Sequence, residues 1–132
     1  MAAYLVVTYD VSDPEQFALY NAESLPVVME SFAKHGGKVL AASADSSWLA
    51  GERQMFGIFE FPSVEAAQAF DNDPNRAAAK EIHHGATTNR IEVIVPGFAP
   101  PGSGDPLSAE VNDIFVSEFV RMAIAKVSAK VE

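Results

Sequence analysis

Three histidines and one carboxylate carry most of the chain's potential for acid–base chemistry. His83 and His84 are adjacent, His35 precedes two glycines, and Glu60 lies in an apolar stretch. Imidazole titrates near neutral pH, and a carboxylate on an apolar surface can serve as a general base. These four residues are therefore the predicted catalytic acids and bases.

The same residues also have structural interpretations. A histidine pair at a helix end interacts favourably with the helix dipole, and His35 suits a position near a helix cap. Glu60 can form an ion pair with Arg90, which lies on another predicted strand. The sequence leaves both interpretations open.

Metal and cofactor chemistry have little support in the sequence. Adjacent helical residues point about 100° apart, so we do not expect His83 and His84 to bind one metal ion. The chain has no cysteine, no His-x-x-x-His spacing, no Gly-x-Ser-x-Gly motif and no phosphate-binding loop. One histidine suffices to bind haem, but nothing in the sequence favours haem. We expect no metal and no cofactor.

A second group of side chains has types suited to orienting a ligand through hydrogen bonds, stacking or charge. Side chains of these types more often serve ordinary packing or lie on the surface. Arg90 is the predicted group for holding developing negative charge. The predicted substrate-binding residues are Tyr4, Thr8, Asp10, Tyr20, Trp48, Phe56 and Arg90.

The first elements that must position these groups are a strand and a helix. Residues 4–11 are rich in β-branched and aromatic side chains, which favours a strand. Ser12 or Asp13 can then cap a helix with Pro14 in its first turn. Pro26 is expected to kink or interrupt this helix, which ends at His35 before the two glycines.

Further along the chain, strands are predicted over residues 38–43, 53–61 and 89–95. Ser63 caps a helix between the last two of these strands, and a break at residues 71–74 separates a second helical piece over residues 75–82. The order is β-α-β-β-α-β. This order predicts a ferredoxin-like α+β fold with helices on one face of an antiparallel sheet.

Alternation along the strands sorts their side chains between two faces. The all-apolar sets, expected beneath the helices, are Leu5, Val7 and Val11, then Met55, Phe59 and Phe61, then Ile91, Val93 and Val95. The other face mixes apolar groups with Tyr4, Thr8, Asp10, Glu60, Arg90 and Glu92. Such a face suits either two sheets packed in a symmetric dimer with a cavity in each subunit, or a plain dimer interface with a polar rim.

The chain divides into a domain over residues 1–97, a linker rich in proline and glycine over residues 98–106, and a predicted amphipathic helix over residues 107–132. The apolar side of this helix must dock on its own domain or on a partner subunit.

Composition excludes several classes of function. The chain has 132 residues with 9 Lys and Arg against 18 Asp and Glu, a formal net charge of −9, and 48% hydrophobic residues. This acidity argues against binding to nucleic acid or to anionic membranes. No apolar run approaches the roughly 20 residues of a membrane span. We expect a cytoplasmic globular protein.

Several of these residues match a known family. They are Tyr4, Asp13, Tyr20, Gly36-Gly37, Gly51, the segment Glu60-Phe61-Pro62-Ser63, Ala66-Ala67, Pro74 and Gly97. Over roughly residues 3–97 the chain resembles the domain of unknown function 1330 family, in the dimeric α/β-barrel superfamily. The resemblance implies a ferredoxin-like subunit that dimerises through its sheet. That superfamily includes cofactor-independent monooxygenases, isomerases, polyketide cyclases, dehydratases and haem proteins, so the fold does not fix the chemistry.

The chain departs from this family in two places. Ile82-His83-His84-Gly85 stands where members often carry an arginine, and the C-terminal helix lies outside the pattern. Two hypotheses follow. The first is a homodimer that binds a largely apolar small molecule and acts as a cofactor-independent isomerase, cyclase or lyase. The second is a non-catalytic binding or assembly module.

Overall fold

The computed structural model describes residues 1–98 and 120–128. The chain forms two compact units, Met1–Gly97 and Phe98–Glu132. In the second unit, residues 120–128 are helical. Most of the predicted linker, and residues 107–119 and 129–132 of the predicted C-terminal helix, lie outside the described residues. No helix in the described ranges is long and apolar enough to cross a membrane.

The first unit follows the predicted order of strands and helices. Its strands are β1 (Ala3–Val11), β2 (Lys38–Ser43), β3 (Met55–Phe61) and β4 (Thr87–Pro96). Its helical segments are α1 (Pro14–Leu19), η1 (Tyr20–Ser24), α2 (Leu25–Lys34), α3 (Val64–Asp71), η2 (Pro74–Arg76) and α4 (Ala77–Ala86).

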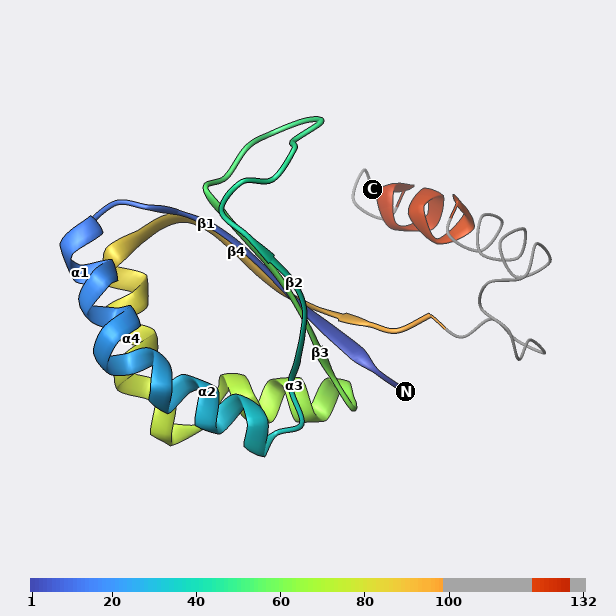
Figure 1. Cartoon of the computed structure of the whole chain (residues 1–132). Coiled ribbons are helices and arrows are strands. Elements are labelled where there is room, and N and C mark those ends of the chain that lie inside the picture. Colours follow the sequence, from blue (N-terminus) through green and yellow to red (C-terminus); the bar gives the residue numbers. More distant parts are fainter. Residues whose placement is uncertain (99–119, 129–132) are drawn as a thin grey trace. The chain divides into compact units, whose positions relative to one another are not determined.

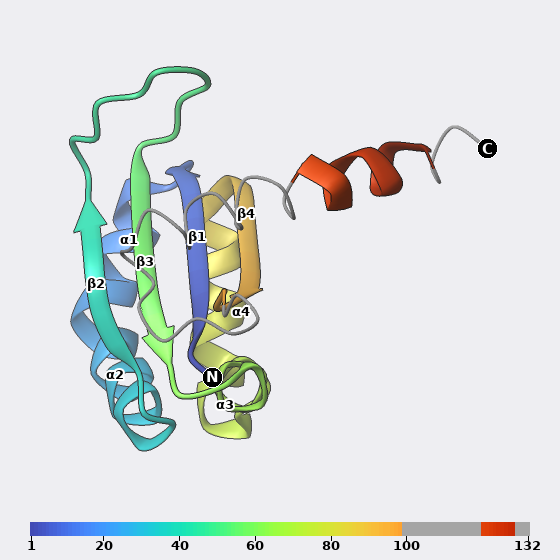
Figure 2. The same cartoon turned by 90° about the vertical axis from the view of Figure 1, so that its right-hand side faces the viewer.

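The four strands form one open antiparallel sheet in the order β2-β3-β1-β4. The helices cover one face of this sheet (Figure 1), and the strands lie side by side across it in the perpendicular view (Figure 2). This is the predicted ferredoxin-like α+β arrangement. The order places the two central strands, β1 and β3, beneath the helices.

Side-chain caps explain where the helices begin. The Asp13 carboxylate accepts a hydrogen bond from the Gln16 amide, and the Ser63 hydroxyl accepts one from the Ala66 amide. Each bond satisfies one of the free N–H groups of a first helical turn. Both caps agree with the sequence-based expectation.

The hydrophobic core lies between α2, α3 and the sheet. The Phe32 ring packs edge-on against Phe61 and Phe70, with centroids 5.4 and 5.7 Å away. Phe61 is completely buried at the end of β3. Since three aromatic rings fill this end of the sandwich, the space that remains lies toward the other end, near α1 and α4.

The structure corrects the prediction for β4. Its register pairs Val7 with Glu92, and Leu5 with Ile94. Glu92 and Ile94 therefore face the helices, while Ile91, Val93 and Val95 lie on the open face and are 50%, 43% and 42% exposed. On β4, apolar content did not identify the covered face. The Glu92 carboxylate lines the cavity on that face, and the open face of the strand is itself apolar.

Two boundaries also differ from expectation. β3 begins at Met55 rather than Arg53, because Arg53 and Gln54 bond to neighbouring segments: the Arg53 guanidinium donates to the Asn89 carbonyl, and the Gln54 amide donates to Asp10. α4 extends to Ala86, so the two adjacent histidines both lie within it rather than beyond it.

Candidate active site

A cavity of about 340 Å³ lies between the helices and the sheet. This volume is within the usual range for small-molecule sites. Most of its wall is apolar. The apolar lining residues are Leu5, Val7, Phe17, Leu25, Val28, Met29, Phe32, Ala42, Met55, Phe56, Phe59 and Phe70.

The polar part of the wall is concentrated on β1, η1, α4 and β4. Its residues are Tyr9, Tyr20, Asn21, Ser43, Asp71, Arg76, Lys80, His83, His84 and Glu92. Two cationic and two anionic side chains occur in this set. With neutral histidines, the wall therefore carries no formal net charge, although the whole chain is strongly acidic.

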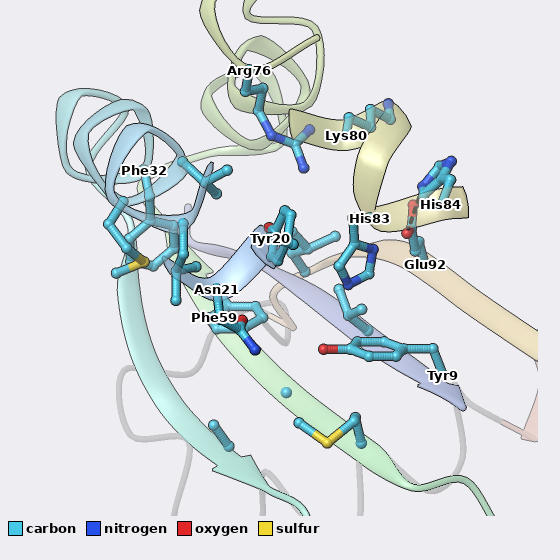
Figure 3. Close-up of a pocket in the computed structure, with 18 of the residues that line it drawn as sticks. Tyr9, Tyr20, Asn21, Phe32, Phe59, Arg76, Lys80, His83, His84 and Glu92 are labelled. Atoms are coloured by element: carbon cyan, nitrogen blue, oxygen red, sulfur yellow. Dashed lines mark hydrogen bonds and ion pairs between the residues drawn. The ribbon is translucent and has the colours of Figure 1, made fainter. Parts of the chain in front are cut away.

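His83 is surrounded by aromatic rings. Its imidazole centroid lies 4.6 Å from Tyr9, 4.9 Å from Tyr20 and 6.1 Å from Phe17. Figure 3 shows the imidazole projecting from α4 toward the Tyr9 ring. Three separate segments of the chain thus converge on this one histidine.

Burial changes the acid–base properties of this group. It lowers the pKa of His83 to about 4, because the charged imidazolium is poorly solvated there. It also raises the pKa of Tyr9 to about 12, with a further contribution from the nearby Tyr20. Both side chains are therefore neutral at pH 7.

Four polar side chains on the wall have no protein partner in the described part of the chain. The Tyr9 and Tyr20 hydroxyls, the Asn21 amide and the His83 imidazole form no side-chain hydrogen bond with any described residue. The Tyr9 hydroxyl and the Asn21 amide point into the same space (Figure 3). Because these groups line the cavity, a molecule bound there can supply their hydrogen-bond partners.

A helical irregularity brings two of these groups to the cavity. η1 is a π-helical turn in which the Leu25 amide donates to the Tyr20 carbonyl, a spacing of five residues. The wider turn carries Tyr20 and Asn21, and π turns are frequent at functional sites. Pro26 follows at the start of α2, close to the interruption that the sequence predicts.

An irregularity in the sheet positions Tyr9. The β1–β4 register shifts between Thr8 and Asp10. The Asp10 carboxylate accepts hydrogen bonds from the Gln54 amide and the Asn89 side chain, which fixes this end of the strand. These hydrogen bonds lower the pKa of Asp10, with the Asn89 bond contributing most.

His84 and Glu92 form a hydrogen-bonded pair at one end of the cavity. The His84 Nε2 and Glu92 Oε1 atoms are 3.1 Å apart, and both side chains are about one-third exposed. The Arg90 guanidinium donates to the carbonyls of His84 and Thr87, which secures the end of α4. The pair joins α4 to β4.

The other charged groups pair with one another. The Asp71 carboxylate lies 2.9 Å from Lys80 Nζ and 3.2 Å from Arg76 Nη1. The Arg76 guanidinium also stacks over Phe70, 4.4 Å from the ring centroid. Two cations therefore share one carboxylate at this side of the cavity.

One group of side chains is close enough to be considered for a metal ion. Donor atoms of His83, His84 and Glu92 all lie within 4.8 Å of one another. The expectation that two adjacent helical histidines cannot bind one metal ion did not take account of this cluster. Its third member, the Glu92 carboxylate, comes from β4 and lies near both imidazole rings. The His84–Glu92 contact already occupies one donor atom of each of these two residues.

The structure brings together part of the predicted site. Tyr20, Phe56, His83 and His84 line the cavity. The register places Tyr4, Thr8 and Glu60 on the opposite, open face of the sheet, where Glu60 is paired with Tyr4 and Lys38. The roles predicted for these residues stay predictions, but they cannot act on the same ligand through this cavity.

The remaining predicted residues have identifiable contacts elsewhere. His35 lies 3.2 Å from the buried Asp73 carboxylate, which also accepts a hydrogen bond from Ser31. Trp48 packs edge-on against Phe56 at 5.8 Å. Arg90 bonds to main-chain carbonyls, and no described ion pair joins it to Glu60.

Sequence reasoning missed several wall residues. Tyr9 alternates with Leu5 and Val7 along β1, a signal that could have placed it on the covered face. Arg76, Lys80 and His83 recur at helical spacing of four and three residues, a polar stripe that faces one direction. Asn21 gave no comparable signal, since its position depends on the π turn.

The comparisons with known proteins agree with this fold. The family described as Domain of unknown function (DUF1330) matches residues 2–98. No curated protein matches the chain. A protein of unknown function from Rhodopseudomonas palustris is 22% identical, with a TM-score of 0.55 over 75% of this chain and 84% of that chain.

Two other solved structures have similar folds at lower identity. A protein from Jannaschia sp. CCS1, described as dimeric, ferredoxin-like and of unknown function, is 10% identical, with a TM-score of 0.58 over 74% of this chain and 100% of that chain. SnoaB, a cofactor-independent oxygenase from Streptomyces nogalater, is 12% identical, with a TM-score of 0.52 over 77% of this chain and 98% of that chain. At these identities the likeness shows the fold alone.

Proposed function

The chain belongs to the DUF1330 family, and from the chemistry of its cavity we propose that it binds a small, largely apolar organic molecule. We propose further that it performs cofactor-independent acid–base chemistry of the isomerase, cyclase or lyase type on that molecule. The residues assigned to this site are Tyr9, Tyr20, Asn21, His83, His84 and Glu92.

One observation carries this proposal. An apolar cavity contains several polar side chains that have no protein partner among the described residues, and these side chains are gathered at one part of its wall. A ligand that is mostly apolar and has one hydrogen-bonding end would match both the apolar and the polar part of the wall. The hydrogen-bonded His84–Glu92 pair adds groups able to donate and accept protons, and the neutral His83 adds a hydrogen-bonding group.

Filling the cavity tests the proposal. Val7 lies on the cavity floor, so Val7→Phe places a ring in the space that a ligand would occupy. Native mass spectrometry of the gently purified full chain should show a small-molecule mass increment for the wild type and a loss of at least about tenfold in its occupancy for Val7→Phe. The matched control is Val39→Phe, because Val39 is 52% exposed and lies outside the cavity wall.

The results separate the two hypotheses for function. An increment that Val7→Phe does not reduce would place the ligand elsewhere and contradict the proposed site. A ligand bound in the cavity that never turns over would favour the binding module over the enzyme.

We also propose that the protein is a homodimer whose two open sheet faces pack together. The open face carries Val6, Ile58, Ile91, Val93 and Val95 by register. A contiguous apolar face of this kind is unusual on a monomer. The similar protein from Jannaschia is described as dimeric, which supports the proposal.

A further inference from the structure

We propose that the ligand is a monocarboxylate, a largely apolar molecule with one anionic end, and that Arg76 binds its carboxylate group. This inference rests on the proposed function and names the ligand class for the same cavity. It is built from three features of one side of the wall: two cations that share one carboxylate, a guanidinium edge without a partner, and an aromatic ring against that guanidinium.

The charges of the wall cancel as a whole but are not evenly distributed. Arg76 and Lys80 both contact the same Asp71 oxygen, so two positive charges face one negative charge. Glu92, the other anion of the wall, contacts His84 instead and forms no ion pair with either cation in the described ranges of the chain. This side of the cavity therefore keeps one uncompensated positive charge.

Arg76 is the cation that gains more from a second anion. Its side chain is 15% exposed, whereas that of Lys80 is 31% exposed, and charges attract more strongly where water is scarce. The carboxylate of the nearby Asp73 contacts Ser31 and His35, and no described ion pair joins it to Arg76. A ligand carboxylate can supply the missing negative charge.

Part of the Arg76 guanidinium has no hydrogen-bond partner. Every side-chain hydrogen bond described for Arg76 uses Nη1, which donates to the carbonyl and the carboxylate of Asp71. The Nε–H group is buried and has no acceptor among the described residues. Nε and Nη2 form one edge of the planar guanidinium, and such an edge matches the two oxygens of a carboxylate. An unsatisfied donor of this kind costs free energy, which a bound carboxylate recovers.

The surroundings of Arg76 suit the apolar part of such a ligand. The guanidinium stacks over Phe70, 4.4 Å from the ring centroid, and Figure 3 shows it directed from η2 toward Tyr20. Burial raises the pKa of Tyr20, and the positive charge of Arg76 opposes this rise, which agrees with their proximity. A ligand with its carboxylate at Arg76 can therefore extend its apolar part along the aromatic wall of the cavity.

Two probes of the same shape test the inference without knowledge of the natural ligand. The anionic probe is 2-naphthoate, and the neutral comparison is 2-naphthamide, which replaces the carboxylate with an uncharged amide. Isothermal titration calorimetry of the full chain at pH 7, in a buffer free of carboxylates and phosphate, gives both Kd values. We expect 2-naphthoate to bind at least about tenfold more tightly than 2-naphthamide, and Val7→Phe to weaken both.

Removing the cation should affect only the anionic probe. Arg76→Met keeps an apolar side chain beside Phe70 and removes the positive charge. We expect it to weaken 2-naphthoate at least about tenfold and to change the 2-naphthamide Kd less than about threefold. The matched control is Lys34→Met, since Lys34 is exposed on α2 outside the cavity wall, and it should change neither Kd.

Two further variants test the charge balance in opposite directions. Asp71→Asn removes the shared negative charge and should tighten 2-naphthoate binding at least about threefold, an effect that a purely structural role of Arg76 does not predict. Lys80→Met leaves Arg76 balanced by Asp71 and should weaken 2-naphthoate at least about threefold. This pair decides the question if Arg76→Met fails to fold.

Each contrary result has a separate meaning. Failure of both probes to bind contradicts the proposed function itself. Equal or tighter binding of 2-naphthamide overturns the anionic ligand and leaves an apolar binding cavity in place. Binding of 2-naphthoate that Arg76→Met and Asp71→Asn leave unchanged, or an equal loss of both probes in folded Arg76→Met, overturns the role of Arg76.

Discussion

His83 combines an aromatic environment with a strongly altered protonation equilibrium. Burial lowers its pKa to about 4, well below the usual value of about 6.5. A neutral imidazole with so little affinity for protons is better suited to hydrogen bonding than to proton abstraction. We therefore propose a ligand-binding role for His83 rather than a catalytic one.

The altered equilibrium of His83 predicts a pH dependence of stability. Between about pH 4 and 6.5, the folded protein binds fewer protons at His83 than the unfolded chain does. The contribution of the neutral His83 imidazole to the free energy of unfolding is therefore fully present above this pH range. That contribution should be lost as the pH falls toward about 4. Urea unfolding at pH 7 and pH 5 should show a drop for the wild type and a smaller drop for His83→Phe, which keeps a ring in place.

An NMR titration provides the direct check. The His83 ring protons should shift with a midpoint near pH 4. A midpoint near 6.5 would show that the imidazole is solvated and would contradict the described burial.

For single residues, the sequence predicted which side chains are suited to chemistry better than it predicted which of them lie together. Both adjacent histidines and Tyr20 were predicted as site residues and line the cavity. Glu60 was predicted as their catalytic partner and lies on the open face, as strand alternation predicts, but the cavity lies on the covered face instead. Asn21 had no sequence signal, since its direction depends on one irregular turn.

Among the helices and strands, α3 shows most directly how one side chain sets a boundary. Its first turn is capped by the Ser63 hydroxyl, which accepts from the Ala66 amide at 3.0 Å. We expect Ser63→Ala to lower the free energy of unfolding by about 1 kcal/mol, because that amide loses its partner. Urea denaturation monitored by circular dichroism measures the change.

A matched serine makes this prediction specific to the cap. Ser24 precedes α2 but makes no capping hydrogen bond. Ser24→Ala should therefore change stability by much less than Ser63→Ala. If the two substitutions lowered the free energy of unfolding equally, the loss at Ser63 would not be due to its capping hydrogen bond.

The order and type of the elements were predictable because local signals agreed. β-branched runs marked the strands, and Asp13 and Ser63 marked the starts of two helices. The boundaries at Met55 and Ala86 were not, since they depend on contacts between distant segments, such as that of Arg53 with Asn89. Such contacts have no local pattern in the sequence.

At the scale of the whole molecule, the open face of the sheet is the surface on which the proposed dimer depends. Val93 is 43% exposed at the middle of β4 in an apolar surrounding. We expect Val93→Lys to convert a dimer to a monomer, because two buried ammonium groups would face each other without partners across a symmetric interface. Size-exclusion chromatography with light scattering gives the mass directly.

A similar substitution outside the proposed interface serves as the control. Ile82 is 40% exposed on α4, on the helical side of the sheet. Ile82→Lys should leave the dimer intact. Monomeric wild-type protein, or loss of the dimer in both variants, would contradict packing through the open face.

The whole-molecule architecture was the part best predicted from the sequence. The β-α-β-β-α-β order and the family resemblance indicated one ferredoxin-like unit, and the family and fold are confirmed. The location of the cavity beneath the helices was not predicted, because the mixed character of β4 was read as belonging to the uncovered face. A partly exposed carboxylate such as Glu92 on the covered face of the sheet departs from the usual apolar pattern of that face, and such departures concentrate at functional sites.

The π turn at η1 has a consequence for the history of the site. Its five-residue hydrogen bond from Leu25 to Tyr20 accommodates one residue more than an α-helical turn. Deleting a single residue there would restore a regular helix and rotate Tyr20 and Asn21 away together, while the strands kept their register. Among relatives, the number of residues between the Asp13 cap and the Gly36 turn is therefore a countable marker that would separate lineages able to form the proposed site from lineages that share only the scaffold.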